Sequence, residues 1–82
     1  INNMAAKDQA FARIATDAAK AGEVKIVQQT VEQISNMTAH DLAIHDAALL
    51  LAKRGLRKQA VDIAKETYNF TQRDQTLSEL AQ

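Results

Sequence analysis

The 82-residue sequence predicts an all-α domain, spanning residues 1–82, that is built from tandem helix-turn-helix hairpins. The composition favours helices, because the chain has no proline, only two glycines and abundant alanine, glutamine, lysine and leucine. No segment alternates apolar and polar residues as a half-buried strand does. A motif also recurs about every 33 residues, as Asn3-Met4, Asn36-Met37 and Asn69-Phe70. We therefore expect two hairpin units, residues 3–35 and 36–68, and a half unit, residues 69–82, that serves as a capping helix.

The first unit is expected to hold one helix at about 4–21 and a second helix at about 23–35. Apolar residues recur at helical spacing in both and should form the core: Phe11, Ile14, Ala15 and Ala18, then Val24, Val27, Val31 and Ile34. Gly22 should end the first helix, because glycine adopts the left-handed conformation after a last turn without steric cost.

The second unit is expected to hold helices at about 39–54 and 56–68, with Gly55 between them and a last helix from about 72. The predicted core of this part comprises Ile44, Ala47, Ala48, Leu51, Leu56, Ala60, Ile63 and Ala64. Leucines also occupy other faces of the 39–54 helix, so that this helix is apolar over most of its circumference. Such a helix is buried on several sides or exposes a contact surface.

The joint between the units contains a Thr-x-x-Asp pattern. Thr38 is placed to cap the 39–54 helix, and Asp41 three residues later would complete a variant of the capping box. Thr71 and Asp74 repeat this pattern in the half unit. The sequence therefore predicts the same local cap at the start of both helices.

The repeat pattern resembles the tetratricopeptide repeat, whose units are helix–turn–helix pairs about 34 residues long. The positions that carry the resemblance are the small residues in the middle of each first helix and the glycines of the turns, namely Ala15, Ala48, Ala81, Gly22 and Gly55. The aromatic positions of the family hold other residues in this chain, and its proline is missing. The resemblance implies a superhelix whose concave face is lined by the first helix of each unit.

The resemblance also implies that the concave face binds an extended peptide or a helix of a partner protein. The positions that would line this face are Gln9, Arg13, Thr16, Lys20, Leu42, His45, Leu49, Lys53, Gln75 and Ser78. Leu42 and Leu49 would anchor the contact, because the hairpin core does not need them, and the polar residues would add specificity. We therefore predict a protein-interaction or assembly module. The alternative is a homo-oligomerising structural domain in which the same leucines meet a second copy.

A nucleic-acid-binding domain is the third hypothesis. Lys53, Arg54, Arg57 and Lys58 surround Gly55 and would contact phosphates if the following helix entered a groove of DNA. The first unit does not repeat this basic patch, and the formal net charge is zero. Both facts argue against nucleic acid as a partner.

Metal binding and catalysis have little support in the sequence. His40, Asp41, His45 and Asp46 form the only cluster of metal-ligating residue types, but only Asp41 and His45 share a helix face. There is no cysteine, no glycine-rich phosphate loop and no Ser–His–acid set that periodicity brings together. We therefore predict no metal, no cofactor, no catalytic residues and no enzymatic activity.

The sequence contains no membrane or export signal. No apolar run approaches the roughly 18 residues of a membrane span, and no secretory signal opens the chain. We expect a cytoplasmic protein with no membrane partner. Because the chain begins at Ile1 rather than methionine, we also expect it to be a fragment of a larger protein or a processed form.

Overall fold

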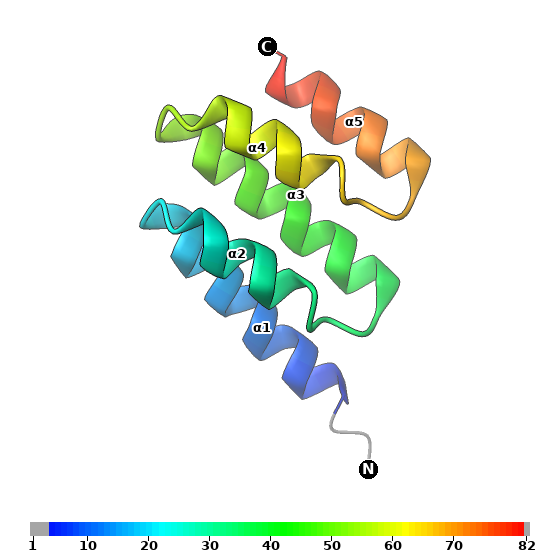
Figure 1. Ribbon diagram of the computed structural model, residues 1–82. Coiled ribbons are helices and arrows are strands. Elements are labelled where there is room, and N and C mark those ends of the chain that lie inside the picture. The colour runs from blue at the N-terminus through cyan, green and yellow to red at the C-terminus, as the bar shows by residue number, and fades with distance from the viewer. Residues whose placement is uncertain (1–3, 82) are drawn as a thin grey trace.

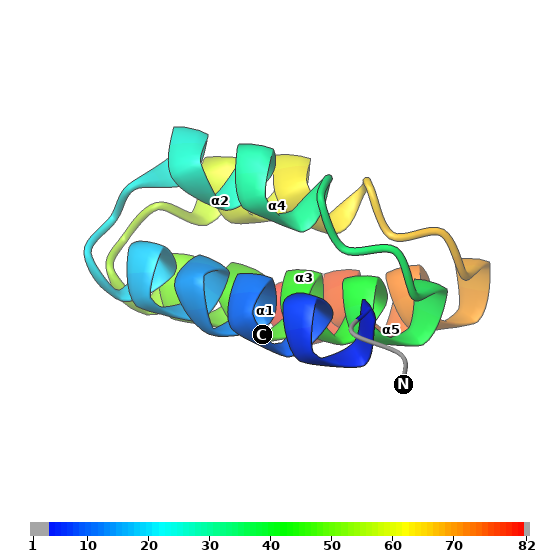
Figure 2. The ribbon, with the colours of Figure 1, turned by 90° about the horizontal axis from the view of Figure 1, so that it is seen from below.

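The computed structural model describes residues 4–81, and these contain five helices and no strand. The helices are α1 (Met4–Lys20), α2 (Val24–Val31), α3 (Met37–Lys53), α4 (Arg57–Ala64) and α5 (Phe70–Leu80). In one layer α1, α3 and α5 lie side by side and run in the same direction, while α2 and α4 run back across them in a second layer (Figures 1 and 2). The prediction of an all-α fold is confirmed.

The glycines end the two long helices as predicted. Gly22 and Gly55 have φ angles of 78° and 86°, in the left-handed region that only glycine adopts easily. The amide of Glu23 donates to the carbonyl of Ala18 at 2.8 Å, which closes a Schellman-type turn beyond α1. Beyond α3, the amide of Leu56 donates to the carbonyl of Leu51 in the same way. These turns reverse the chain within a few residues and bring α2 and α4 back over α1 and α3.

Asparagine, not threonine, caps α3 and α5. The side-chain oxygen of Asn36 accepts a hydrogen bond from the amide of Ala39 at 2.9 Å, and Asn69 accepts one from Gln72 at 2.9 Å. The prediction of a threonine cap at Thr38, and of its copy in the half unit, is wrong. Both helices begin earlier than expected, because an asparagine in extended conformation accepts the unpaired amide three residues on, in the first turn.

The returning helices are shorter than predicted. Each has eight residues and ends at Val31 or Ala64, where the sequence predicted ends near residues 35 and 68. The amides of Ser35 and Asn36 donate to the carboxylate of Asp8 instead of to helical carbonyls. The amides of Gln33 and Ile34 already bond only three residues back, so α2 has ended before this long-range acceptor directs the chain into α3.

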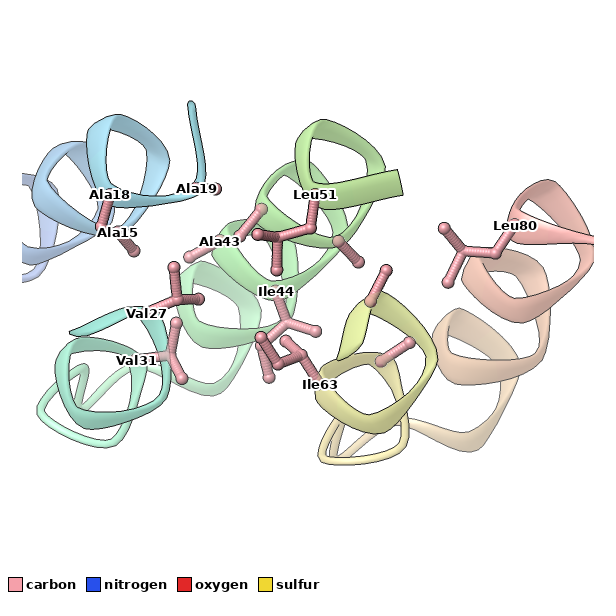
Figure 3. Close-up of a cluster of buried hydrophobic side chains, with 14 of the residues drawn as sticks. Ala15, Ala18, Ala19, Val27, Val31, Ala43, Ile44, Leu51, Ile63 and Leu80 are labelled. Atoms are coloured by element: carbon pink, nitrogen blue, oxygen red, sulfur yellow. The ribbon is translucent and has the colours of Figure 1, made fainter. Parts of the chain in front are cut away.

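The core lies between the two layers and is rich in alanine (Figure 3). Its largest fully buried apolar side chains are Ile44, Leu51, Ile63, Val27 and Val31. Alanines make up most of the rest, so the helices approach one another closely. Ile14 differs from the prediction, because 47% of it is exposed on the outer edge of α1.

Candidate functional site

A buried carboxylate joins the first unit to the second. Asp8 of α1 accepts hydrogen bonds from the amides of Ser35 and Asn36, each at 3.0 Å. Its two oxygens therefore hold the start of α3 beside the start of α1. This contact keeps the two helices parallel, and we call Asp8 a clamp carboxylate.

Asp41 is the second clamp carboxylate. It accepts from the amides of Tyr68 and Asn69 at 3.0 and 3.1 Å, at the same sequence separations of 27 and 28 residues as for Asp8. Burial raises the pKa of Asp41, but hydrogen bonds from His40 and from the two amides outweigh burial and leave that pKa below its usual value. His40 itself is buried and stacks on Tyr68 with ring centroids 4.0 Å apart. Asp41 therefore connects the second unit to the start of α5, while His40 packs on the segment that leads into it.

A groove of about 980 Å³ runs between α1 and α3. We call it the α1–α3 groove, and the predicted concave-face residues that line it are Gln9, Arg13, Thr16, Lys20 and Leu42. On α1 these residues recur at helical spacing on the side opposite the buried alanines that face α2. The structure thus brings together the α1 residues that the sequence predicted and one of the two predicted leucines.

The groove has an apolar floor and a charged rim. Ala12, Ala39 and Ala43 line it with small side chains, and Leu42, 53% exposed, stands beside them. Arg13, Lys20, Asp17 and Asp46 are exposed at its rim. An apolar residue of a ligand could bury surface against Leu42 while its polar groups meet side chains of either charge.

The residues that face each other differ between the two junctions of neighbouring helices. At the junction of α3 and α5, His45 Nε2 bonds to Glu79 Oε2 at 2.5 Å and bridges the two helices. At the junction of α1 and α3, the same repeat positions hold Ala12 and Asp46. Alanine cannot reach across, so the surface between α1 and α3 remains accessible.

The electrostatics of His45 reflect its position in this bridge. Burial lowers the pKa of His45, but its hydrogen bonds to Glu79 and Asp46 raise it by more. The net effect is a pKa above the ordinary value of histidine. The side chain of His45 is therefore held by hydrogen bonds at the junction of α3 and α5.

The other predicted site residues lie outside the α1–α3 groove. Leu49 is half-buried and packs against the core cluster, so it is part of the fold as well as of the surface. Lys53 is exposed near the end of α3, and Gln75 and Ser78 are exposed on α5. Leu42 also lines a smaller pocket of about 290 Å³ between the starts of α3 and α5.

Sequence reasoning missed Ala39 and Ala43 of the groove floor and the role of Arg54. The alanines of the floor carry no functional signal of their own, and only comparison of Ala12 with His45 one unit later shows why the surface is open. Arg54 donates to the carbonyl of Lys20 at 2.8 Å, which ties the second turn to the end of α1. This residue of the basic patch therefore has a structural partner.

The described residues offer no metal site or membrane span. Within residues 4–81, no three side chains of the metal-ligating types gather closely enough to hold an ion. None of α1 to α5 is long and apolar enough to cross a membrane. No protein-family model matches this chain, and no curated protein or solved structure is significantly similar to it.

Proposed function

We propose that this domain is a protein-interaction module that binds a peptide segment or a helix of a partner protein in the α1–α3 groove. The observation that carries the proposal is the half-exposed Leu42 beside a floor of alanines. An exposed leucine next to a recess is the arrangement that anchors an apolar side chain of a ligand. The tetratricopeptide-like pattern of the sequence supports the same class of function.

The dimensions of the groove suit a short segment of chain. Its lining extends along α1 from Asp8 to Lys20, roughly 18 Å at the rise of an α-helix. That length accommodates about five extended residues or three helical turns. The rim carries both signs of charge, which fits a peptide of mixed charge better than the uniform anionic backbone of a nucleic acid.

The test is a binding measurement on matched surface variants. Peptides would be selected from a phage-displayed random library on the wild-type protein, synthesised and titrated by calorimetry. We expect Leu42→Glu to weaken their binding at least tenfold, because the charge opposes burial of the anchoring side chain. Ile26→Glu is the matched control, since Ile26 is 40% exposed on α2, outside the groove, and its replacement should leave the Kd unchanged.

A second variant closes the groove instead of charging it. Ala12→His gives α1 the residue that α3 has at this position, opposite Asp46, and should bridge the groove as His45 bridges to Glu79. Peptide binding should again fall at least tenfold, while unfolding in urea stays close to that of the wild type. Peptides that bind both variants normally, or a library that yields no binder, would disprove the proposal.

A further inference from the structure

The outer edge of α5 carries a third copy of the clamp carboxylate. Asp74 stands in α5 at the repeat position that Asp8 holds in α1 and Asp41 in α3. Its side chain is 70% exposed, and among residues 4–81 its only polar side-chain contact is Arg73 of the same helix, at 3.2 Å. The first two clamps each hold the following unit, so the third marks a surface of the same kind.

The outer edge of α1 carries the other half of such a junction. Ala10 and Ile14 are exposed there, whereas Ala43 and Ala47, at the same positions in α3, are buried in the junction with α1. At the position of Ile14, Ala47 is 0% exposed and Leu80 of α5 is 3% exposed. The position is therefore buried wherever a preceding unit is present.

We propose that copies of this chain stack head to tail, with the outer edge of α1 of one copy seated on the outer edge of α5 of another. A second copy is the partner that fits, because both edges belong to this chain and their contact continues a packing that already occurs twice within it (Figure 1). In this stack Ile14 is covered by α5, and Asp74 lies at the junction, at the repeat position that Asp8 holds in α1.

The stacking has a defined geometry and strength. The two edges differ, so each copy keeps one edge open after pairing, and the assembly grows as an open chain instead of closing as a symmetric dimer. The contact involves one helix edge of each copy, and small interfaces form weak complexes, so we expect the association to depend on concentration. The groove beside Leu42 takes no part in it.

Sedimentation velocity of the wild-type protein tests the proposal first. From about 10 μM to 1 mM, where weak complexes form, the weight-average mass should rise continuously and pass that of a dimer. Ile14→Glu disables the α1 edge and Asp74→Lys disables the α5 edge, so each variant alone should remain monomeric. Leu42→Glu should associate like the wild type, which separates this contact from the proposed peptide site.

A mixture of the two edge variants tests most directly whether the α1 edge of one copy binds the α5 edge of another. The Ile14→Glu chain retains its α5 edge and the Asp74→Lys chain retains its α1 edge, so an equimolar mixture should form a one-to-one heterodimer and stop there. Circular dichroism and urea unfolding at low concentration confirm that both variants fold. A wild-type protein that stays monomeric throughout, a mass that stops at a dimer, or single variants that associate normally would each overturn the proposal.

Discussion

At the scale of single residues, the same repeat position has different consequences in the two units. His45 reaches across to Glu79 and links α3 to α5, whereas Ala12 ends at its methyl group and leaves a groove. Asp46, at the position of Glu79, therefore has no histidine opposite it on α1. The side chains at these positions thus determine whether the surface between neighbouring helices is bridged or open.

The His45 bridge makes stability depend on pH. Because the folded-state pKa of His45 is raised, the bridge stabilises the protein fully below the unfolded-state pKa of about 6.5 and loses this contribution as pH rises through the folded-state pKa. The wild-type protein should therefore have a higher free energy of unfolding than the His45→Gln variant. This difference should be largest at about pH 5.5 and smallest near pH 8.5. The change should be within about 0.2–1 kcal/mol, since the side chains of Asp46 and Glu79 are 60% and 40% exposed.

Urea unfolding of both proteins across this pH range measures the effect. Glu79→Gln is the matched control, because it removes the charge that raises the pKa of His45 and should flatten the pH dependence. A stability difference that grows with pH would show that the bridge uses the neutral imidazole.

At the scale of elements, local sequence signals predict where the helices lie but not the residues at which α3 and α5 begin. Periodic apolar residues and the two glycines predict each helix and the ends of α1 and α3. The pattern around α3 also indicates a helix buried on several sides, and α3 does contact α1, α4 and α5. The Thr-x-x-Asp pattern predicts the wrong starts, because Asn36 and Asn69 cap α3 and α5 two residues before the threonines. In α3 the aspartate of the pattern instead accepts amides 27 and 28 residues away.

The two turn glycines provide an element-scale prediction. Alanine at either position is strained by the positive φ, which costs about 1–2 kcal/mol. Gly55 has nothing within 4 Å of an added Cβ, whereas at Gly22 that atom would lie 3.0 Å from Nε of Arg54. Gly22→Ala should therefore destabilise more than Gly55→Ala, by about 0.5–1.5 kcal/mol if the Arg54 hydrogen bond to Lys20 is lost.

Thermal or urea unfolding of the two variants gives this comparison directly. Arg54→Ala is the control, because without this side chain the two glycine substitutions should cost the same. Equal losses in the wild-type background would mean that Arg54 moves aside at no cost.

At the scale of the whole molecule, the sequence predicts the helical content and the inner surface of α1 but not how the units are joined. The tetratricopeptide resemblance places Gln9, Arg13, Thr16 and Lys20 on one surface, and they do line one groove. Leu49 was predicted as a free surface leucine, yet it packs against the core, because its helix has neighbours on both sides. Such contacts depend on residues about one unit away, and local patterns do not contain them.

The clamp carboxylates make the junctions between units testable by a single substitution repeated three times. Asp8→Asn and Asp41→Asn should each lower the free energy of unfolding by about 1–3 kcal/mol, because an amide side chain cannot accept both backbone amides. Asp74→Asn should change it by less than about 0.5 kcal/mol at low protein concentration, since Asp74 is exposed. The lowered pKa of Asp41 adds a signature, because its contribution is present above the unfolded-state pKa of about 3.9 and is lost as pH falls through the folded-state pKa. If Asp74→Asn lowered the free energy of unfolding as much as Asp41→Asn, the aspartate at this repeat position would stabilise its own helix. The long-range contact between units would then not explain why aspartate recurs there.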